Sequence, residues 1–304
     1  MKIVVAGGLG HIGSYFIRDI SDLFDEVIII DNLRTQRYCS LFDLGFIKNS
    51  FLNEDLTTYD ITHLIEEGDI VLNLAAITDA SSSFINKAEV ENNNLKITQN
   101  LALSTARKKA KFIFISSTSV YGSQKEIVDE NCTGYDLKPQ SPYAETKLKE
   151  EAVIKKFISE YDLKACIFRF GTIYGTSPGI RFHTAVNKFC WQASFGIPLT
   201  VWKDNYHQMR PYLDIKDASN SIKHVINNNL FHGEIYNVLT NNLRVSDIIE
   251  IIEQHVPNLE IQFVDSPIMN QLSYEVSSKK FKETSFKYLG SPQIQIANTL
   301  NLFK

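Results

Sequence analysis

The sequence lacks the features that mark several large classes of protein. Its 304 residues hold four scattered cysteines with no Cys-x-x-Cys pair and no zinc-ligand spacing, which argues against a disulfide framework and a metal site. Lysine and arginine number 31 against 35 acidic residues, so no basic excess favours nucleic acid or an anionic membrane. No apolar run approaches the length of a membrane span or a signal peptide. We therefore expect a soluble, cytoplasmic protein with no nucleic-acid or membrane partner.

What the chain does have is the composition of a globular protein, long enough to bury a core without cross-links. Over its first half, short apolar runs alternate with segments of helical period. The runs are continuously apolar, as strands buried on both faces are, and they cover Ile3–Ala6, Glu26–Ile30, Ile70–Leu74, Phe112–Ile115 and Ala165–Phe168. This alternation predicts βαβ units in a doubly wound parallel sheet, a Rossmann-like α/β fold.

The pattern changes after about Gly171, where strands become sparse and loop signals rich in glycine and proline appear. We expect a dinucleotide-binding domain over residues 1–170, which also carries the catalytic residues. A smaller lobe over residues 171–304 is expected to bind the substrate. Segments near residues 211–238 are expected to return to the main domain.

A glycine-rich turn follows the first predicted strand and opens the first predicted helix. Glycines at 7, 10 and 13 let the backbone approach a pyrophosphate, which the helix N-terminus attracts through its free N–H groups. Asp31 ends the second predicted strand, where a carboxylate accepts both adenosine ribose hydroxyls and repels a 2′-phosphate. This favours NAD(H) over NADP(H), a preference that Arg34 and Arg37 would soften. The alternatives are a turn without a ligand and a turn role for Asp31.

A tyrosine and a lysine are four residues apart on a predicted helix that starts at Ser141-Pro142. Both Tyr143 and Lys147 therefore project from one helix face. Ser117 follows the strand predicted at 112–115, at the sheet edge where doubly wound proteins bind ligands. A tyrosine base needs its pKa lowered by roughly three units to work near neutrality. The lysine ammonium and a positive nicotinamide ring would supply this effect, so we expect these three residues to be catalytic.

Together these motifs resemble the extended short-chain dehydrogenase/reductases. The strongest resemblance is to their NAD-dependent nucleotide-sugar epimerase/dehydratase branch, similar to UDP-galactose 4-epimerase, and it covers nearly the whole chain. It implies NAD as the cofactor, with Asp55 beside the adenine amino group unless that residue is a helix cap. The implied cofactor-binding residues are Gly7, Gly10, His11, Ile12, Gly13, Asp31, Asn32, Asp55, Leu56, Leu74, Ala75, Ala76, Asn94, Tyr143 and Lys147.

The resemblance also implies a nucleotide-sugar substrate. The substrate-binding residues would be Thr78, Ser81, Ser117, Thr118, Thr172, His183, Trp202 and Arg210. Trp202 would lie against the nucleotide base and Arg210 would bind the pyrophosphate. Alternatively, the tryptophan is a core residue and the arginine pairs with Asp214 or Asp204. The Arg-x-Gly-Asp element of the family should fall near residues 268–271 and is absent, which leaves the nucleotide and the sugar open.

The residues after Ser117 narrow the reaction. Family dehydratases and decarboxylases carry acidic residues there, whereas this chain has Thr118 and Ser119. We therefore expect an isomerase of carbohydrate biosynthesis that epimerises a nucleotide sugar, at C4, through a transient keto-sugar. The alternatives are an NAD(P)H-dependent reductase or dehydrogenase of a nucleotide keto-sugar or small hydroxyl substrate, and a catalytically silent nucleotide sensor. The family also implies a homodimer, formed through helices near residues 91–108 and 141–160.

Overall fold

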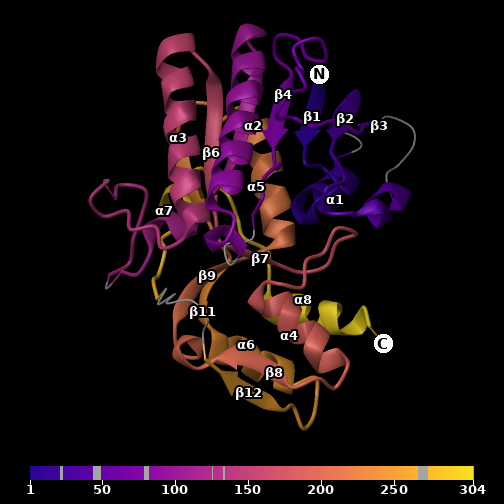
Figure 1. Cartoon of the computed structure of the whole chain (residues 1–304), viewed down its shortest axis with the longest axis vertical. Coiled ribbons are helices and arrows are strands. Elements are labelled where there is room, and N and C mark those ends of the chain that lie inside the picture. Colours follow the sequence, from indigo (N-terminus) through magenta and orange to yellow (C-terminus); the bar gives the residue numbers. More distant parts are fainter. Residues whose placement is uncertain are drawn as a thin grey trace.

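The computed structural model describes residues 1–20, 23–43, 49–78, 82–124, 126–132, 134–265 and 273–303. Within these residues, seven parallel strands form the central sheet in the order β10-β6-β5-β4-β1-β2-β3 (Figure 1). Their bounds are β1 (Lys2–Ala6), β2 (Glu26–Ile30), β3 (Asn49–Leu52), β4 (Ile70–Asn73), β5 (Lys111–Ser117), β6 (Lys164–Phe170) and β10 (Ile235–Val238). The strand order reverses between β1 and β4, so the carboxyl ends of these strands mark the switch point where ligands bind.

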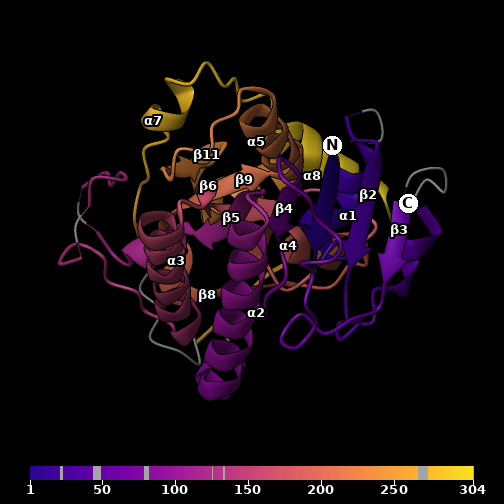
Figure 2. The same ribbon diagram turned by 90° about the horizontal axis from the view of Figure 1, so that it is seen from above.

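Helices cover both faces of this sheet (Figure 2). On one face lie α1 (His11–Arg18) and α5 (Ile215–Asn227), and on the other α2 (Lys87–Arg107) and α3 (Pro142–Tyr161). Successive residues of β1 show why its sequence is apolar throughout. Ile3 and Val5 belong to the core beside α1, and Val4 to the core beside α2. The predicted doubly wound α/β fold is confirmed.

The two ends of α3 follow from local sequence. Ser141 caps the N-terminus by accepting a hydrogen bond from Ala144 N, and Pro142 occupies the first turn. The helix ends at Asp162, whose backbone is left-handed. Tyr143 therefore lies in the first turn of α3, at a helix end that a side chain fixes.

A second, smaller unit lies below the sheet in Figure 1. It contains the three-stranded sheet β11 (Asn241–Arg244), β9 (Met209–Asp214), β7 (Thr172–Tyr174) and the pair β8 (Leu199–Trp202) and β12 (Ile261–Val264). The helices α4 (Ala185–Ser194), α6 (Val245–Glu253) and α8 (Pro292–Asn301) share a core of their own with these strands. A short helix, α7 (Lys279–Lys282), packs near β10.

Strand β10 and helices α5 and α7 lie beyond residue 171 and belong to the main body. Strand β10 pairs with β6 at the edge of the central sheet, and α5 packs beside α1. Strand β9, by contrast, lies in the sheet of the smaller unit. The boundary expected at residues 170 and 171 stays a prediction. Among the described residues, no helix is both long enough and apolar enough to cross a membrane.

Candidate active site

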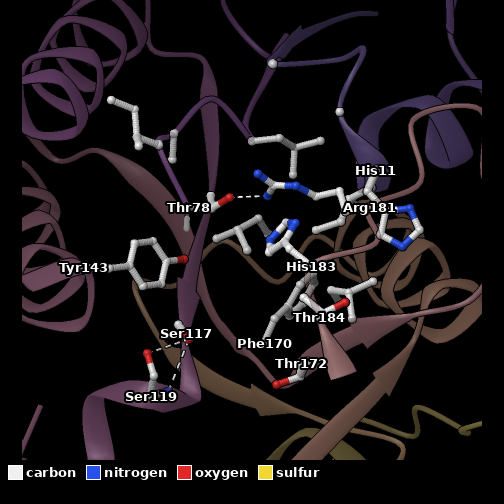
Figure 3. Close-up of a pocket in the computed structure, with 18 of the residues that line it drawn as sticks. His11, Thr78, Ser117, Ser119, Tyr143, Phe170, Thr172, Arg181, His183 and Thr184 are labelled. Atoms are coloured by element: carbon white, nitrogen blue, oxygen red, sulfur yellow. Dashed lines mark hydrogen bonds between the residues drawn. The ribbon is translucent and has the colours of Figure 1, made fainter. Parts of the chain in front are cut away.

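A cavity of about 660 Å³ opens at the carboxyl ends of the central strands and extends between the main body and the smaller unit. The expected site residues that line it are Gly7, Gly10, His11, Ile12, Gly13, Asp31, Asn32, Leu56, Leu74, Ala75, Ala76, Thr78, Ser117, Thr118, Tyr143, Lys147, Thr172, His183, Trp202 and Arg210. Figure 3 shows its centre, where the Tyr143 ring points inward and Arg181 and His183 lie across from it. The cavity thus brings together residues expected to bind the cofactor and residues expected to act on the substrate.

The glycine-rich turn leaves no room for larger side chains. Gly7 has a φ of +73°, and a Cβ there would lie 2.7 Å from backbone atoms of Ala75. A Cβ on Gly13 would lie 2.5 Å from the carbonyl oxygen of Gly8. Because these glycines carry no side chain, a ligand can approach the first turn of α1, whose backbone N–H groups have no partner within the helix.

His11 adds a second indication of a ligand at this turn. Its Nδ1 lies 2.6 Å from Ser177 Oγ, whereas its Nε2 is buried with no hydrogen-bond partner among the described residues. Burial lowers the pKa of His11 to about 3, and the charge of Arg37 adds to the effect, so the ring is neutral. The glycine cradle, the helix N-terminus and this unpartnered nitrogen fit the pyrophosphate of a dinucleotide.

Asp31 is fixed in place beside the turn. One carboxylate oxygen accepts a hydrogen bond from Leu9 N at 3.2 Å and the other from Leu33 N at 2.9 Å. The two neighbouring arginines are bound elsewhere: Arg34 pairs with Glu89 at 2.6 Å, and Arg37 donates to the carbonyl oxygen of Gly179. The geometry therefore leaves a carboxylate at the position where the adenosine ribose of NAD is expected.

Of the expected residues that the structure describes, two do not line the cavity. Asp55 is exposed and accepts a hydrogen bond from Thr57 N, while its neighbours Glu54 and Leu56 are the ones that line it. Asn94 is fully buried and binds both backbone groups of Ile77, at 2.8 Å and 3.0 Å. It therefore holds the segment after β4 in place from behind. Ser81 and the stretch 268–271, where the Arg-x-Gly-Asp element was expected, lie outside the described residues.

The three expected catalytic residues come together at the centre of the cavity. Ser117 ends β5, and its Oγ lies 2.9 Å from Ser119 Oγ and accepts a hydrogen bond from the Ser119 backbone (Figure 3). Lys147 is buried, and its Nζ lies 5.8 Å from the ring centre of Tyr143 and 4.6 Å from that of Phe114. Serine, tyrosine and lysine thus reach one cavity from β5 and α3.

Burial and the nearby positive charges act in opposite directions on the Tyr143 phenol. Burial raises the pKa of Tyr143 above its ordinary value; Lys147 and Arg181 lower it, and Glu150 raises it. Within the chain alone, burial outweighs the effect of the lysine, so the expected lowering by the lysine and the nicotinamide ring together stays a prediction. A phenolate near neutral pH needs positive charge from outside the chain.

Behind the cavity, a buried ion pair connects α3 to the sheet. Arg169 donates two hydrogen bonds to the Glu151 carboxylate, at 2.9 Å and 2.7 Å, and a third to the Tyr121 hydroxyl. Ser116 donates to the same carboxylate, and the Tyr121 hydroxyl donates to Asn237 on β10. Arg169 is therefore a structural ion-pair partner of Glu151.

The end of the cavity in the smaller unit is cationic. Trp202 on β8 and Arg210 on β9 both line it, as do Arg181 and Lys188, which the sequence analysis did not identify. Arg181 donates a hydrogen bond to Thr78 across the cavity (Figure 3). Among the lining residues described, the carboxylates belong to Asp31 and Glu54 near the glycine-rich turn; none lies at the cationic end. This end suits an anion.

A tyrosine from the C-terminal part of the chain also reaches the site. The Tyr274 hydroxyl lies 3.4 Å from Thr118 Oγ1, and its ring is buried against the cavity. No sequence signal marked Tyr274 or Arg181, because neither belongs to a motif or a periodic pattern. Among the described residues, no cluster of histidine, cysteine and carboxylates is suited to a metal ion.

Comparison with known proteins agrees with this geometry. Residues 3–238 match the model of the NAD dependent epimerase/dehydratase family. The chain belongs to this family. A relative from Bacillus subtilis, named as an uncharacterized UDP-glucose epimerase, is 32% identical over 251 residues, which are 78% of this chain and 76% of the relative. The crystal structure of the UDP-glucuronic acid 4-epimerase from Bacillus cereus, in complex with UDP-glucuronic acid and NAD, superposes with a TM-score of 0.88 at 25% identity, covering 100% of this chain and 99% of the other.

The family also contains dehydratases. A trifunctional UDP-glucose 4,6-dehydratase/UDP-4-keto-6-deoxy-D-glucose 3,5-epimerase/UDP-4-keto-L-rhamnose-reductase from Arabidopsis thaliana is 26% identical over 308 residues, which are 94% of this chain and 44% of that longer protein. This epimerase/dehydratase family member is therefore an NAD-dependent enzyme, and its cofactor is NAD. The glycine-rich turn and the Asp31 carboxylate fit NAD in shape and in charge, and the assignment of the individual residues stays a prediction.

Proposed function

We propose that the protein catalyses the NAD-dependent epimerisation of a nucleotide-diphosphate sugar, at C4, through a transient keto-sugar. The observation that carries this proposal is the cavity itself, which places Ser117, Tyr143 and Lys147 between a dinucleotide cradle and a cationic end. The epimerase names of the Bacillus relatives support it. The residue roles given below are part of the proposal.

NAD, when bound, supplies the hydride acceptor and donor. The Tyr143 phenolate oxygen takes the proton of the sugar C4 hydroxyl, and Ser117 donates a hydrogen bond to the same sugar oxygen. Lys147 stabilises the phenolate by its charge. After the keto-sugar has rotated in the cavity and the hydride has returned to C4, Tyr143 returns the proton to the C4 oxygen. Epimerisation thus needs no acid or base beyond these side chains.

Among the described residues, no carboxylate beside Ser117 lines the cavity, and this favours epimerisation over dehydration. Removal of water from the sugar needs a second acid–base pair at its ring carbons. The positions after Ser117 hold Thr118 and Ser119, and the lining carboxylates that the structure describes lie near the glycine-rich turn. The hydroxyl groups of threonine and serine are not bases at neutral pH. A dehydratase reaction therefore has no support in this cavity.

The cationic end suits the nucleoside diphosphate part of the substrate. Arg210 offers a planar fork that matches phosphate oxygens, and Lys188 adds a second positive charge. Trp202 presents an aromatic face, on which a nucleotide base can stack. We assign the base and the pyrophosphate to these three residues and the sugar to the centre of the cavity.

The proposal is tested by incubating the protein with UDP-glucose, UDP-glucuronic acid and UDP-N-acetylglucosamine without added cofactor, and identifying products by NMR. We expect the 4-epimer of one of them. Tyr143→Phe should lower kcat by about 10²–10⁴-fold, the range for general acid–base groups, and leave NAD affinity nearly unchanged. Lys147→Ala should lower both kcat and the affinity for NAD. Turnover that consumes stoichiometric NAD(P)H would establish the reductase instead, and loss of water would establish a dehydratase.

We also propose that the protein is a cytoplasmic homodimer that pairs through α2 and α3. Its four cysteines are free, which suits a reducing compartment. On the outer side of these helices, exposed ion pairs join Lys87 to Glu145 and Lys149 to Glu91, and these charged side chains are available to a partner helix. Light scattering at micromolar concentration should give the mass of a dimer, and a monomeric mass would contradict this assignment.

A further inference from the structure

A buried carboxylate that the proposed mechanism does not use lies next to Lys147. Glu150 follows the lysine by three residues on α3 and is 0% exposed. Its Oε2 lies 3.1 Å from Lys147 Nζ, and the lysine side chain is 4% exposed. These two opposite charges are therefore in contact and shielded from water, where the interaction between charges is strong.

Glu150 is itself held by a second helix. Its Oε1 accepts a hydrogen bond of 2.6 Å from Thr98 Oγ1 on α2. The same hydroxyl accepts a hydrogen bond from Asn73 Nδ2 at the end of β4, and Asn73 Oδ1 accepts one from Ala75 N. Asn73 and Ala75 line the cavity. A run of hydrogen bonds thus connects Lys147 to the strand end that faces the cofactor.

The neighbouring Glu151 has a different place in the structure. Its carboxylate binds Arg169 and Ser116 behind the cavity. Glu150 and Glu151 are therefore two adjacent buried carboxylates with separate partners. The one that contacts the proposed catalytic lysine is Glu150.

We propose that Glu150 is a positioning residue, which holds the Lys147 ammonium in the cavity wall and balances its charge at the Tyr143 phenol. The inference rests on the proposed function in one respect, the catalytic role of Lys147 and Tyr143. A lysine has a long flexible stem, and a buried ammonium is costly without a counter-charge. Glu150 meets both needs, since it is fixed by Thr98 and carries the opposite charge.

The balance of charge has a consequence for the tyrosine. Because Lys147 and Glu150 neutralise each other, ionising Tyr143 leaves a net negative charge in a buried site. Without the carboxylate, the same ionisation would give a neutral phenolate–ammonium pair. The pKa values agree in direction: Glu150 raises the pKa of Tyr143 and that of Lys147. The other charged groups that act on the pair are Arg181, which lowers the pKa of Tyr143, and Glu151, which raises that of Lys147.

The test is Glu150→Gln, which keeps an acceptor for Thr98 and removes the charge. Phenolate formation is followed by ultraviolet difference spectroscopy in the protein with and without NAD, and the spectrum of Tyr143→Phe is subtracted to isolate Tyr143. We expect Tyr143 to ionise at a pH lower by about one unit or more, the size of effect that a close charge produces. The pH profile of epimerisation should shift to lower pH as well. Because the spectroscopic titration needs no sugar, it stands even if the proposed epimerase activity fails.

Two further variants complete the experiment. Glu145→Gln removes a carboxylate from the same helix where it is exposed and pairs with Lys87, so its titration should match the wild type. Glu150→Asp restores the charge at a longer distance and should give an intermediate value; it also replaces Glu150→Gln if that variant fails to fold. A Tyr143 titration in Glu150→Gln or in Glu150→Asp that coincides with the wild type would overturn the proposal, as would an equal shift in Glu145→Gln.

Discussion

At the scale of single residues, the site depends on charges that lie close together in a buried setting. Asp31 is the clearest case on the cofactor side, because two backbone N–H groups fix its carboxylate at the end of β2. A ribose with free hydroxyls can donate to this carboxylate, whereas a 2′-phosphate would meet a like charge. The same fixed geometry that binds one cofactor therefore rejects the other.

We predict that NAD(H) binds more tightly than NADP(H) by about tenfold or more, which corresponds to about 1.4 kcal/mol. Asp31→Ala should reduce this difference mainly by improving the affinity for NADP(H), since the repulsion is removed. Fluorescence titration of the cofactor-free protein with both dinucleotides measures the effect. Equal affinities in the wild type would contradict the assignment of the carboxylate.

A second buried carboxylate affects stability instead of binding. Asp214 is 1% exposed, and burial raises its pKa to about 6, with the neighbouring Asp217 adding to the effect. The folded state thus holds the proton more tightly than the unfolded state, whose pKa for this group is 3.8. The stability that protonated Asp214 contributes is complete below the unfolded pKa and is lost as the pH rises through about 6.

From this shift we predict that Asp214 lowers the free energy of unfolding by about 3 kcal/mol between pH 4 and pH 6.5. Urea denaturation at several pH values, compared between wild type and Asp214→Asn, isolates the contribution of this group. The difference between the two proteins should change with pH in that interval. A constant difference would show that Asp214 titrates normally in the folded protein.

At the scale of secondary-structure elements, the sequence predicted five strands of the central sheet and the start of α3, because neighbouring residues determine them. The strands of the central sheet are continuously apolar because both faces are covered, and α3 begins where Ser141-Pro142 indicated. Helices α4 and α8 were not predicted, since they pack on each other in a core formed by distant segments. Strand β8 pairs with β12, which lies some sixty residues later, and no local pattern shows such a pairing.

The N-terminus of α3 links an element to the chemistry, because Tyr143 lies in its first turn. We predict that Ser141→Ala lowers the free energy of unfolding by about 1 kcal/mol, the usual effect of losing an N-cap. It should also lower kcat more than NAD affinity. Ser291→Ala is a matched control, because Ser291 caps α8 ahead of a proline in the same way and does not line the cavity. Denaturation and steady-state kinetics of both variants distinguish a specific effect on Tyr143 from a general one. An equal loss of kcat in the two variants would show a general effect of destabilisation.

At the scale of the whole molecule, the cavity joins two units with different tasks. The central sheet and its helices supply the cofactor cradle and the three proposed catalytic residues. The cradle and Ser117 were predictable because they follow strand ends, and Tyr143 and Lys147 because they are four residues apart on a predicted helix. The smaller unit supplies Arg181, Lys188, Arg210 and Tyr274. Only Arg210 was predicted among these, through the family resemblance, because the others reach the cavity by the way the two units pack. The residues proposed to recognise the substrate therefore depend on tertiary packing for their positions more than the proposed catalytic residues do.

Arg210 tests whether the smaller unit recognises a nucleoside diphosphate. Its guanidinium donates a hydrogen bond of 3.4 Å to Gln208 and lines the cavity beside Tyr212, on the far side from the cradle for NAD. Arg210→Ala should weaken the binding of a nucleotide sugar by roughly 1.5–3 kcal/mol, the range for hydrogen bonds to charged groups, without changing NAD affinity. Lys203→Ala is the control, because Lys203 is an exposed cation of the same unit that pairs with Asp265 and does not line the cavity. Calorimetry of the NAD-loaded proteins with UDP and the other nucleoside diphosphates measures both. If none of them binds and Arg210→Ala changes stability alone, the substrate is a small hydroxyl compound, and the cationic end of the cavity serves the fold.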